Sequence, residues 1–131
     1  MTLGDMNHNA QPPVAVVRPG VNLRSYLQLA GIPSNMYTLD ENMHDRDFTS
    51  ALKRHADVCL HTSKAEGFGM VVLECQALGT PVVTTNYTAM RDYTRLGIAV
   101  ESAAHEQING ARLAVTDSRA AAKALRDIAV G

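Results

Sequence analysis

Short apolar runs alternate along the chain with longer stretches in which apolar positions recur every three or four residues. The short runs predict strands at residues 14–17, 36–39, 58–61, 82–85 and 98–100. The longer stretches predict helices over residues 22–30, 45–56, 70–78 and 88–93, and a last helix from residue 118 onward. Strands that alternate with helices predict an α/β fold, a doubly wound and mostly parallel sheet with helices on both faces.

Capping and stop residues agree with these boundaries. Asn22, Asp45 and Asp117 stand where a side chain can accept a hydrogen bond from the first turn of a helix. Gly31 and Gly79 stand where helices end, because glycine adopts the left-handed conformation of a helix terminus at little cost. The fold prediction therefore rests on two independent kinds of signal.

Residues 66–74, Glu-Gly-Phe-Gly-Met-Val-Val-Leu-Glu, form the most specific motif in the chain. They predict a tight loop followed by a helix. Gly67 and Gly69 would let the backbone approach a ligand, and the helix start would present free amides to an anion. Glu66 lies at the loop and Glu74 about two helical turns further on, roughly 10 Å away. This arrangement suits a long polar ligand with a phosphate in its middle and hydroxyl groups at both ends, such as a nucleotide sugar.

A purely structural interpretation exists for each of these residues. The helix dipole alone would stabilise Glu66, and a plain tight turn would account for Gly67 and Gly69. Glu74, within an otherwise apolar helix, could instead form an ion pair with a lysine or arginine. The spacing of the two carboxylates around the glycines favours the functional interpretation.

The predicted topology places two loops at the same edge of the sheet. In open parallel sheets, ligands bind beyond the carboxyl ends of the strands. The loops at residues 62–68 and 85–88 both fall there. A ligand site at this edge is therefore predicted independently of the motif.

The segment from Ala56 to about Val100 resembles the nucleotide-sugar-binding half of retaining GT-B glycosyltransferases of the group 1 or family 4 type. The residues that carry the resemblance are Ala56-Asp57-Val58, residues 63–69 (Ser-Lys-Ala-Glu-Gly-Phe-Gly), Leu73-Glu74 and residues 77–84 (Ala-Leu-Gly-Thr-Pro-Val-Val-Thr). A fainter likeness at residues 111–114 and Asp117 implies a helix start there. The resemblance implies a Rossmann-like half of a GT-B fold, with the ligand at the motif.

Roles for single residues follow from the same resemblance. Glu66 would be the catalytic residue that contacts hydroxyl groups of the donor sugar, and Glu74 would bind the ribose hydroxyl groups. Donor contacts would also come from Gly67, Phe68, Gly69 and Met70 at the helix start, and from Asn86 and Thr88, although a turn and a helix cap explain the last two equally well. The segment Asp45-Arg46-Asp47 looks like a metal-binding Asp-x-Asp motif, but it falls at a predicted helix start and is interpreted as a cap. No metal and no cofactor are expected, and His61 is expected to be part of the scaffold.

One departure from the family concerns cationic residues. Family members carry an arginine and a lysine that clamp the diphosphate, and these would precede Val14, where residues 1–13 contain neither. The acceptor-binding half of these enzymes has no counterpart in this sequence either. The chain is therefore expected to be a fragment, with a flexible leader at residues 1–13 and a partial donor domain at residues 14–131, inactive alone.

Composition narrows the class of protein. A chain of 131 residues with 46% hydrophobic content suffices for one domain, and a net charge of −1 without tryptophan argues against a nucleic-acid partner. No apolar run is long enough to span a membrane, and no signal peptide is recognised, so a cytoplasmic location is expected. Cys59 and Cys75 fall in apolar patterns and are expected to be free, buried thiols.

Two main functions compete. The first is hexosyl transfer with retention from a UDP-, GDP- or ADP-sugar to a hydroxyl group of a glycan, lipid or protein acceptor. The second is a non-catalytic nucleotide-sugar-binding or scaffold module. A dinucleotide-binding domain is disfavoured, because no Gly-x-Gly-x-x-Gly follows the first strand.

Overall fold

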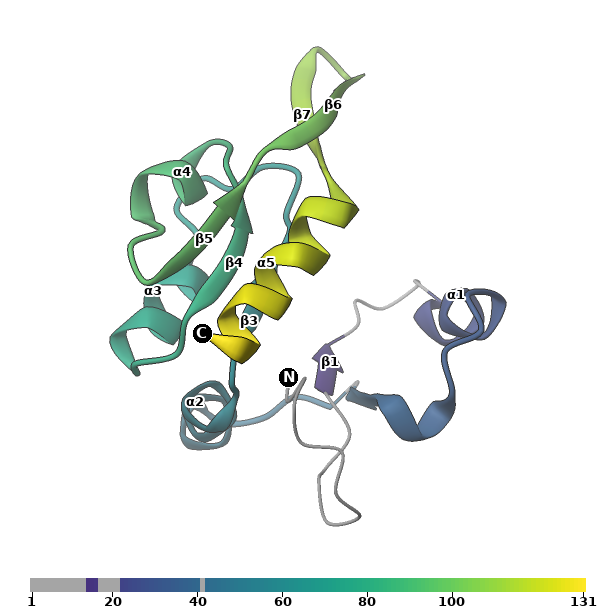
Figure 1. The fold of residues 1–131 in the computed structure, drawn as a ribbon, viewed down its shortest axis with the longest axis vertical. Helices are drawn as coiled ribbons and strands as arrows, with labels where there is room; N and C mark the ends of the chain where they lie inside the picture. The colour runs from purple at the N-terminus through teal and green to yellow at the C-terminus, as the bar shows by residue number, and fades with distance from the viewer. Residues whose placement is uncertain (1–13, 17–21, 41) are drawn as a thin grey trace.

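The structure, a computed structural model, describes residues 14–16, 22–40 and 42–131. The expected leader at residues 1–13 lies outside the described residues, as does Val17 at the end of the first predicted strand. The elements follow the order β1 (Val14–Val16), α1 (Leu23–Leu29), η1 (Ser34–Met36), β2 (Thr38–Asp40), α2 (Arg46–His55), β3 (Cys59–His61), α3 (Met70–Ala77), β4 (Val82–Thr85), α4 (Ala89–Tyr93), β5 (Gly97–Val100), β6 (Ser102–Ile108), β7 (Ala111–Thr116) and α5 (Ser118–Val130) (Figure 1). The alternation of strands and helices is as predicted as far as β5.

The central sheet has the strand order β3-β4-β5, and both pairings are parallel. Cys59 lies opposite Val82, and Val83 lies opposite Ile98. β1 and β2 pair in parallel with each other, as a separate two-stranded sheet. The parallel α/β architecture is therefore confirmed, with the parallel strands divided between two sheets.

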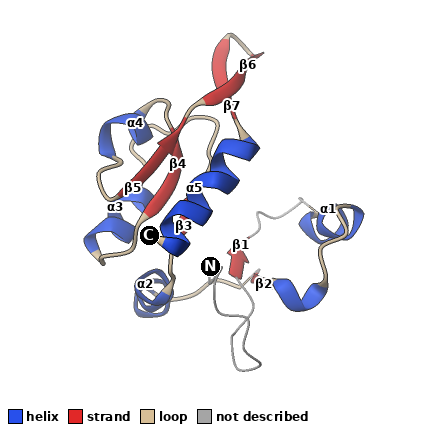
Figure 2. Cartoon of the chain, in the orientation of Figure 1, coloured by secondary structure: helices blue, strands red, loops and turns tan. Residues whose placement is uncertain are grey.

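Helices cover both faces of the central sheet (Figure 2). On one face, α5 packs Ala121 and Ala124 against Val83. On the other, α3 and α4 pack Val72 and Met90 against Val82. Successive residues of a strand point to opposite faces, so neighbouring valines of β4 serve two different cores.

The predicted caps form. Asn22 accepts a hydrogen bond from the Ser25 amide at 3.1 Å, and Asp45 accepts one from the Phe48 amide at 2.8 Å. Asp117 accepts from two amides of the first turn of α5, at 3.0 and 3.1 Å. Gly79 follows α3 with φ +85°, as expected of a helix stop. The segment at residues 45–47 is thus a helix start, and Asp45 is its cap.

The predicted helix start at residues 111–114 is wrong, because these residues belong to the antiparallel hairpin β6–β7. The turn is Asn109-Gly110, and both residues have positive φ, +50° and +80°, as a type I′ hairpin turn requires. An Asn-Gly pair is a strong hairpin signal in a sequence. The last helix begins at Ser118 after its cap Asp117, as predicted.

The expectation of free cysteines is also wrong, since Cys59 and Cys75 form a disulfide. β3 and α3 pack against each other on one face of the sheet, which brings the two Cα atoms to 6.7 Å from each other.

α3 is less covered than its apolar sequence suggests, because Met70 is 60% exposed and Val71 41% exposed. Among the described residues, no helix has the length and apolar character needed to cross a membrane.

Candidate functional site

The loops that follow β3 and β4 meet at the carboxyl end of the sheet. His61, the last residue of β3, lies opposite Thr84 in β4. The Glu66 amide donates a hydrogen bond to Thr88 Oγ1 at 3.0 Å, and the Ala89 amide donates to the Glu66 carbonyl at 3.4 Å. The structure therefore brings together two of the predicted site residues, Glu66 and Thr88, from different loops.

The Glu66 carboxylate is held in place by a histidine. His61 Nε2 lies 3.0 Å from Glu66 Oε1, and the Glu66 side chain stays 33% exposed. Because a carboxylate accepts, the ring nitrogen donates this hydrogen bond. His61, expected to be part of the scaffold, thus fixes the orientation of the carboxylate while leaving it open to a ligand.

The two glycines of the motif have different structural roles. Gly69 is buried with φ +76° and directly precedes α3, and its carbonyl accepts from the Val72 amide at 3.1 Å. A side chain at Gly67 would meet no atom within 4 Å. The turn therefore requires glycine at position 69, whereas at position 67 glycine leaves open space beside the loop. The amides of Met70 and Val71 precede the first amide of α3 that is bonded to the Gly69 carbonyl, so these two can bind an anion.

Thr88 has a strained backbone. Its φ of +51° and ψ of −141° are unusual for a β-branched residue. Strain of this kind costs about 1–3 kcal/mol and tends to occur at functional sites. Here it directs the hydroxyl group of Thr88 at the Glu66 amide, immediately before α4.

Glu74 forms an ion pair with Lys53 of α2. This is the structural interpretation that the sequence left open. Among the described residues, no hydrogen bond or ion pair joins Glu74 to the loop at residues 62–69. Its side chain is still 43% exposed, so it remains accessible beside α2.

The other predicted residues surround this junction. Phe68 is 54% exposed, and its ring packs on Tyr93 of α4 with centroids 5.4 Å apart. Met70 is exposed at the start of α3. Asn86 donates from its side chain to Glu101 at 2.6 Å, so its amide group is already engaged. The structure thus places Phe68 and Met70 on the surface and ties Asn86 to the start of the hairpin.

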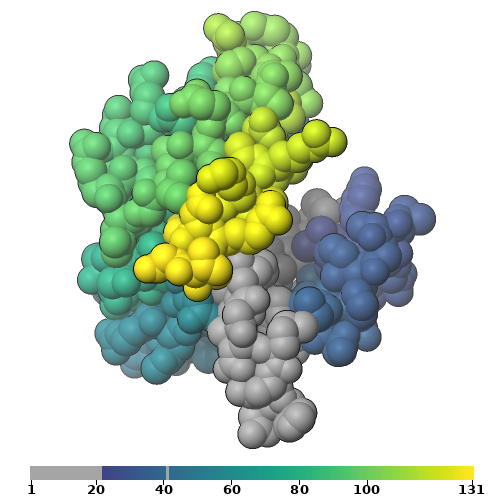
Figure 3. Space-filling view, viewed as in Figure 1, coloured from purple at the N-terminus to yellow at the C-terminus, as the bar shows by residue number. Residues whose placement is uncertain are grey.

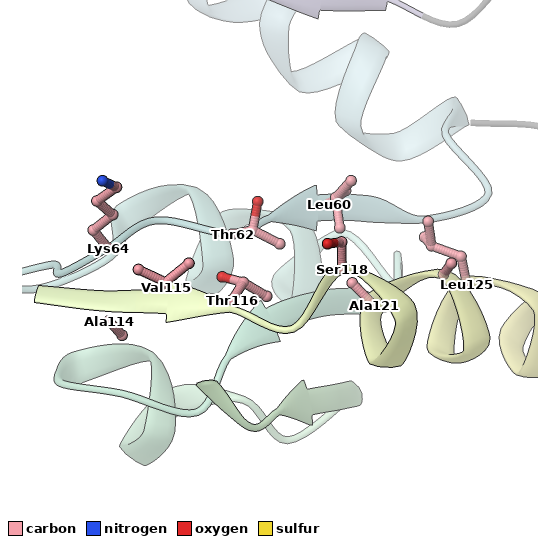
Figure 4. Close-up of a pocket in the computed structure, with 10 residues that line it drawn as sticks. Leu60, Thr62, Lys64, Ala114, Val115, Thr116, Ser118, Ala121 and Leu125 are labelled. Carbon is pink, nitrogen blue, oxygen red and sulfur yellow. The ribbon is translucent and has the colours of Figure 1, made fainter. Parts of the chain in front are cut away.

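A pocket of about 360 Å³ lies between β7 and α5, on the face of β3 that points away from α3 (Figure 4). It is lined by Leu60, Thr62, Lys64, Ala114, Val115, Thr116, Ser118, Ala121, Ala122 and Leu125. The predicted elements do not form this pocket, because one of its walls is β7, a hairpin strand at residues where a helix start is predicted. The Asn-Gly turn is the signal from which it could have been inferred.

In the part of the chain that the structure describes, no three His, Cys, Asp or Glu side chains are grouped so that they could hold a metal ion. Among the titratable groups of the described residues, one has a clearly shifted pKa. The backbone amide of Asn42 and then the His44 side chain, by hydrogen bonding to Asp40, hold the pKa of that carboxyl group below its usual value. Asp40 ends β2 and belongs to the smaller sheet, away from the Glu66 loop in sequence.

Comparison with known proteins places this geometry in a family. A search of curated proteins gives no significant match. The family model described as glycosyl transferases group 1 matches residues 22–129, which include all the predicted site residues and most of the chain. The chain therefore belongs to the group 1 glycosyltransferases.

Proposed function

We propose that the site at the carboxyl ends of β3 and β4 binds the nucleotide-sugar donor of a retaining GT-B glycosyltransferase. The donor would be a UDP-, GDP- or ADP-linked hexose. The acceptor would be a hydroxyl group of a glycan, lipid or protein, presented by an acceptor-binding domain separate from residues 22–131. The observation that carries the proposal is the hydrogen bond between Glu66 and Thr88, which joins two predicted donor loops at the edge where parallel sheets bind ligands.

The proposed reaction breaks the bond between the anomeric carbon and the diphosphate and forms a bond from that carbon to the acceptor oxygen. The acceptor oxygen releases its proton to water, and the nucleoside diphosphate leaves with the electron pair of the broken bond and so with an added negative charge. The amides at the start of α3 are suited to stabilise this charge, which develops as the bond breaks. Glu66, oriented by His61, would hold the sugar hydroxyl groups.

Glu74 takes the ribose in this proposal. Lys53 already neutralises its carboxylate, but a carboxylate has several lone pairs and can accept from ribose hydroxyl groups at the same time. Removal of Glu74 should therefore weaken nucleoside binding as well as nucleotide-sugar binding. Removal of Glu66 should affect only ligands that carry the sugar.

Saturation-transfer NMR with a panel of UDP-, GDP- and ADP-sugars tests the proposal on the full chain. We expect signals from one nucleotide class, loss of the sugar-proton signals in Glu66→Gln, and loss of most signals in Glu74→Gln. Asp57→Asn is the matched control, because Asp57 is exposed just before β3, at the opposite end of the strand. Binding of no sugar nucleotide by a folded chain, or equal signals in all variants, would contradict the proposal.

A further inference from the structure

The β6–β7 hairpin places two nitrogen-bearing side chains over the loop that follows β4. The ring of His105 lies edge-on to Tyr87 with centroids 5.2 Å apart, and the Tyr87 hydroxyl donates to the Arg112 carbonyl at 2.8 Å. A hydrogen bond of 2.6 Å between Thr85 and Thr116 fixes the base of the hairpin to the end of β4. The hairpin projects beyond this end of the sheet (Figures 1 and 3).

His105 and Arg112 lie on the same face of the hairpin. His105 pairs with Ala114 and Gln107 pairs with Arg112, so the two side chains are diagonal neighbours. Arg112 Nη2 lies 3.3 Å from His105 Nδ1, which accepts this hydrogen bond. Both residues are exposed.

Neither residue has an acidic partner among the described residues. Two carboxylates lie nearby, but other groups hold them. Glu106, on the opposite face of the hairpin, pairs with Lys64 at 2.5 Å, and Glu101 accepts from Asn86 at 2.6 Å. The Arg112 guanidinium therefore keeps most of its donors free, and these match the geometry of phosphate oxygens.

A short series of contacts leads from this pair to the predicted donor site. Tyr87, which contacts both His105 and Arg112, directly precedes Thr88. Thr88 in turn accepts from the Glu66 amide. Two consecutive residues of the β4–α4 connection, Tyr87 and Thr88, thus link the hairpin pair to the Glu66 loop.

We propose that Arg112, with His105 beside it, binds the diphosphate of the nucleotide-sugar donor. This inference rests on the proposed function. It gives the site a cationic contact from the hairpin, whereas residues 1–13 contain no arginine or lysine. His105 orients the guanidinium through Nδ1, and Tyr87 ties the hairpin to the donor loop.

Calorimetric titration of the full chain with the nucleoside diphosphate of the class that binds, and with its nucleoside, tests this inference. Arg112→Gln should weaken diphosphate binding by about tenfold, as expected for the loss of a charge-assisted hydrogen bond. It should leave nucleoside binding unchanged. Arg126→Gln, an exposed arginine on α5, is the matched control and should change neither affinity.

Arg112→Lys keeps the charge and the hairpin while removing the forked geometry, and should give an intermediate loss. If circular dichroism shows that Arg112→Gln disturbs the hairpin, Arg112→Lys still tests the inference. Unchanged diphosphate affinity in both folded variants would overturn the inference while leaving the proposed function intact. Failure of the unaltered chain to bind any sugar nucleotide would overturn both.

Discussion

The segment at residues 22–57 and the segment from Val58 onward differ in how they are stabilised. Every buried residue among those described lies at Val58 or later, whereas α1, η1 and α2 contribute none. The first segment relies on local caps, on the pairing of β2 with β1 and on the contact of α2 with α3. The second has two cores, one on each face of the sheet. The candidate site lies wholly in the second segment, so its loops are positioned by a packed scaffold.

The largest stability effect is expected at Gly97, the first residue of β5. A Cβ atom there would lie 1.9 Å from the Val82 carbonyl oxygen, and the φ of +134° excludes most other residues. Gly97→Ala should destabilise the chain by more than about 4 kcal/mol, because the backbone of the central strand cannot move aside. Urea denaturation measures the effect.

Gly110→Ala is the control for this substitution. Gly110 also has a positive φ, +80°, but no atom lies within 4 Å of its Cβ position. The cost should be the conformational strain alone, about 1 kcal/mol. Equal losses in the two variants would contradict the account of the β4–β5 core.

The Cys59–Cys75 disulfide should give the second-largest effect. It joins β3 to α3 across 16 residues of sequence, and closing a loop of this size in the unfolded chain stabilises a protein by about 3 kcal/mol. Reduction with dithiothreitol should lower the free energy of unfolding by about this amount. Cys59→Ala/Cys75→Ala is the control and should be insensitive to the reductant. An unchanged unfolding midpoint on reduction would show that the bond contributes nothing.

A pair of core and surface substitutions compares the two segments directly. Val83 is fully buried in β4, whereas Leu29 of α1 is 86% exposed. Val83→Ala should cost about 2 kcal/mol through lost burial and the cavity that remains, while Leu29→Ala should stay within about 0.5 kcal/mol. Urea denaturation of both variants tests whether the stability lies in the second segment. A larger loss from Leu29→Ala would reverse the comparison.

Asp40 should give the smallest effect, and only in acid. The Asn42 amide and His44 hold its pKa below the usual value, so Asp40 stabilises the fold above its unfolded pKa. This contribution is lost as the pH falls through the lower folded pKa. In Asp40→Asn, the unfolding temperature should therefore fall less steeply as the pH is lowered from 6 into the range where Asp40 becomes protonated. Thermal unfolding at a series of pH values measures this dependence. An identical profile in the variant would exclude this role.

The sequence predicted the elements as far as β5, because their signals are local. Caps such as Asp45 and stops such as Gly79 act within one helical turn, and the apolar runs mark the strands of the central sheet. The hairpin is not among the predicted elements, because the prediction at residues 111–114 follows the likeness to a helix start and makes no use of the Asn109-Gly110 turn. The disulfide was missed because composition favours free thiols, whereas the pairing depends on how β3 and α3 pack.

The candidate site was predictable in its loops and less so in its contacts. Glu66 and Thr88 follow adjacent parallel strands, so topology alone brings them together. The pairing of Glu74 with Lys53 depends on the position of α2, which no local pattern specifies. The contacts of Arg112 were not predictable either, because its neighbours Tyr87 and His105 come from different parts of the chain.

Amide chemical-shift mapping with the sugar nucleotide that binds is the most direct test of where the donor lies. The account predicts shifts at residues 62–74, 86–89 and on the hairpin at His105 and Arg112. It predicts little change at residues 22–45. Shifts that cluster in that first segment, with none at Glu66 or Thr88, would contradict a donor site at the carboxyl ends of β3 and β4.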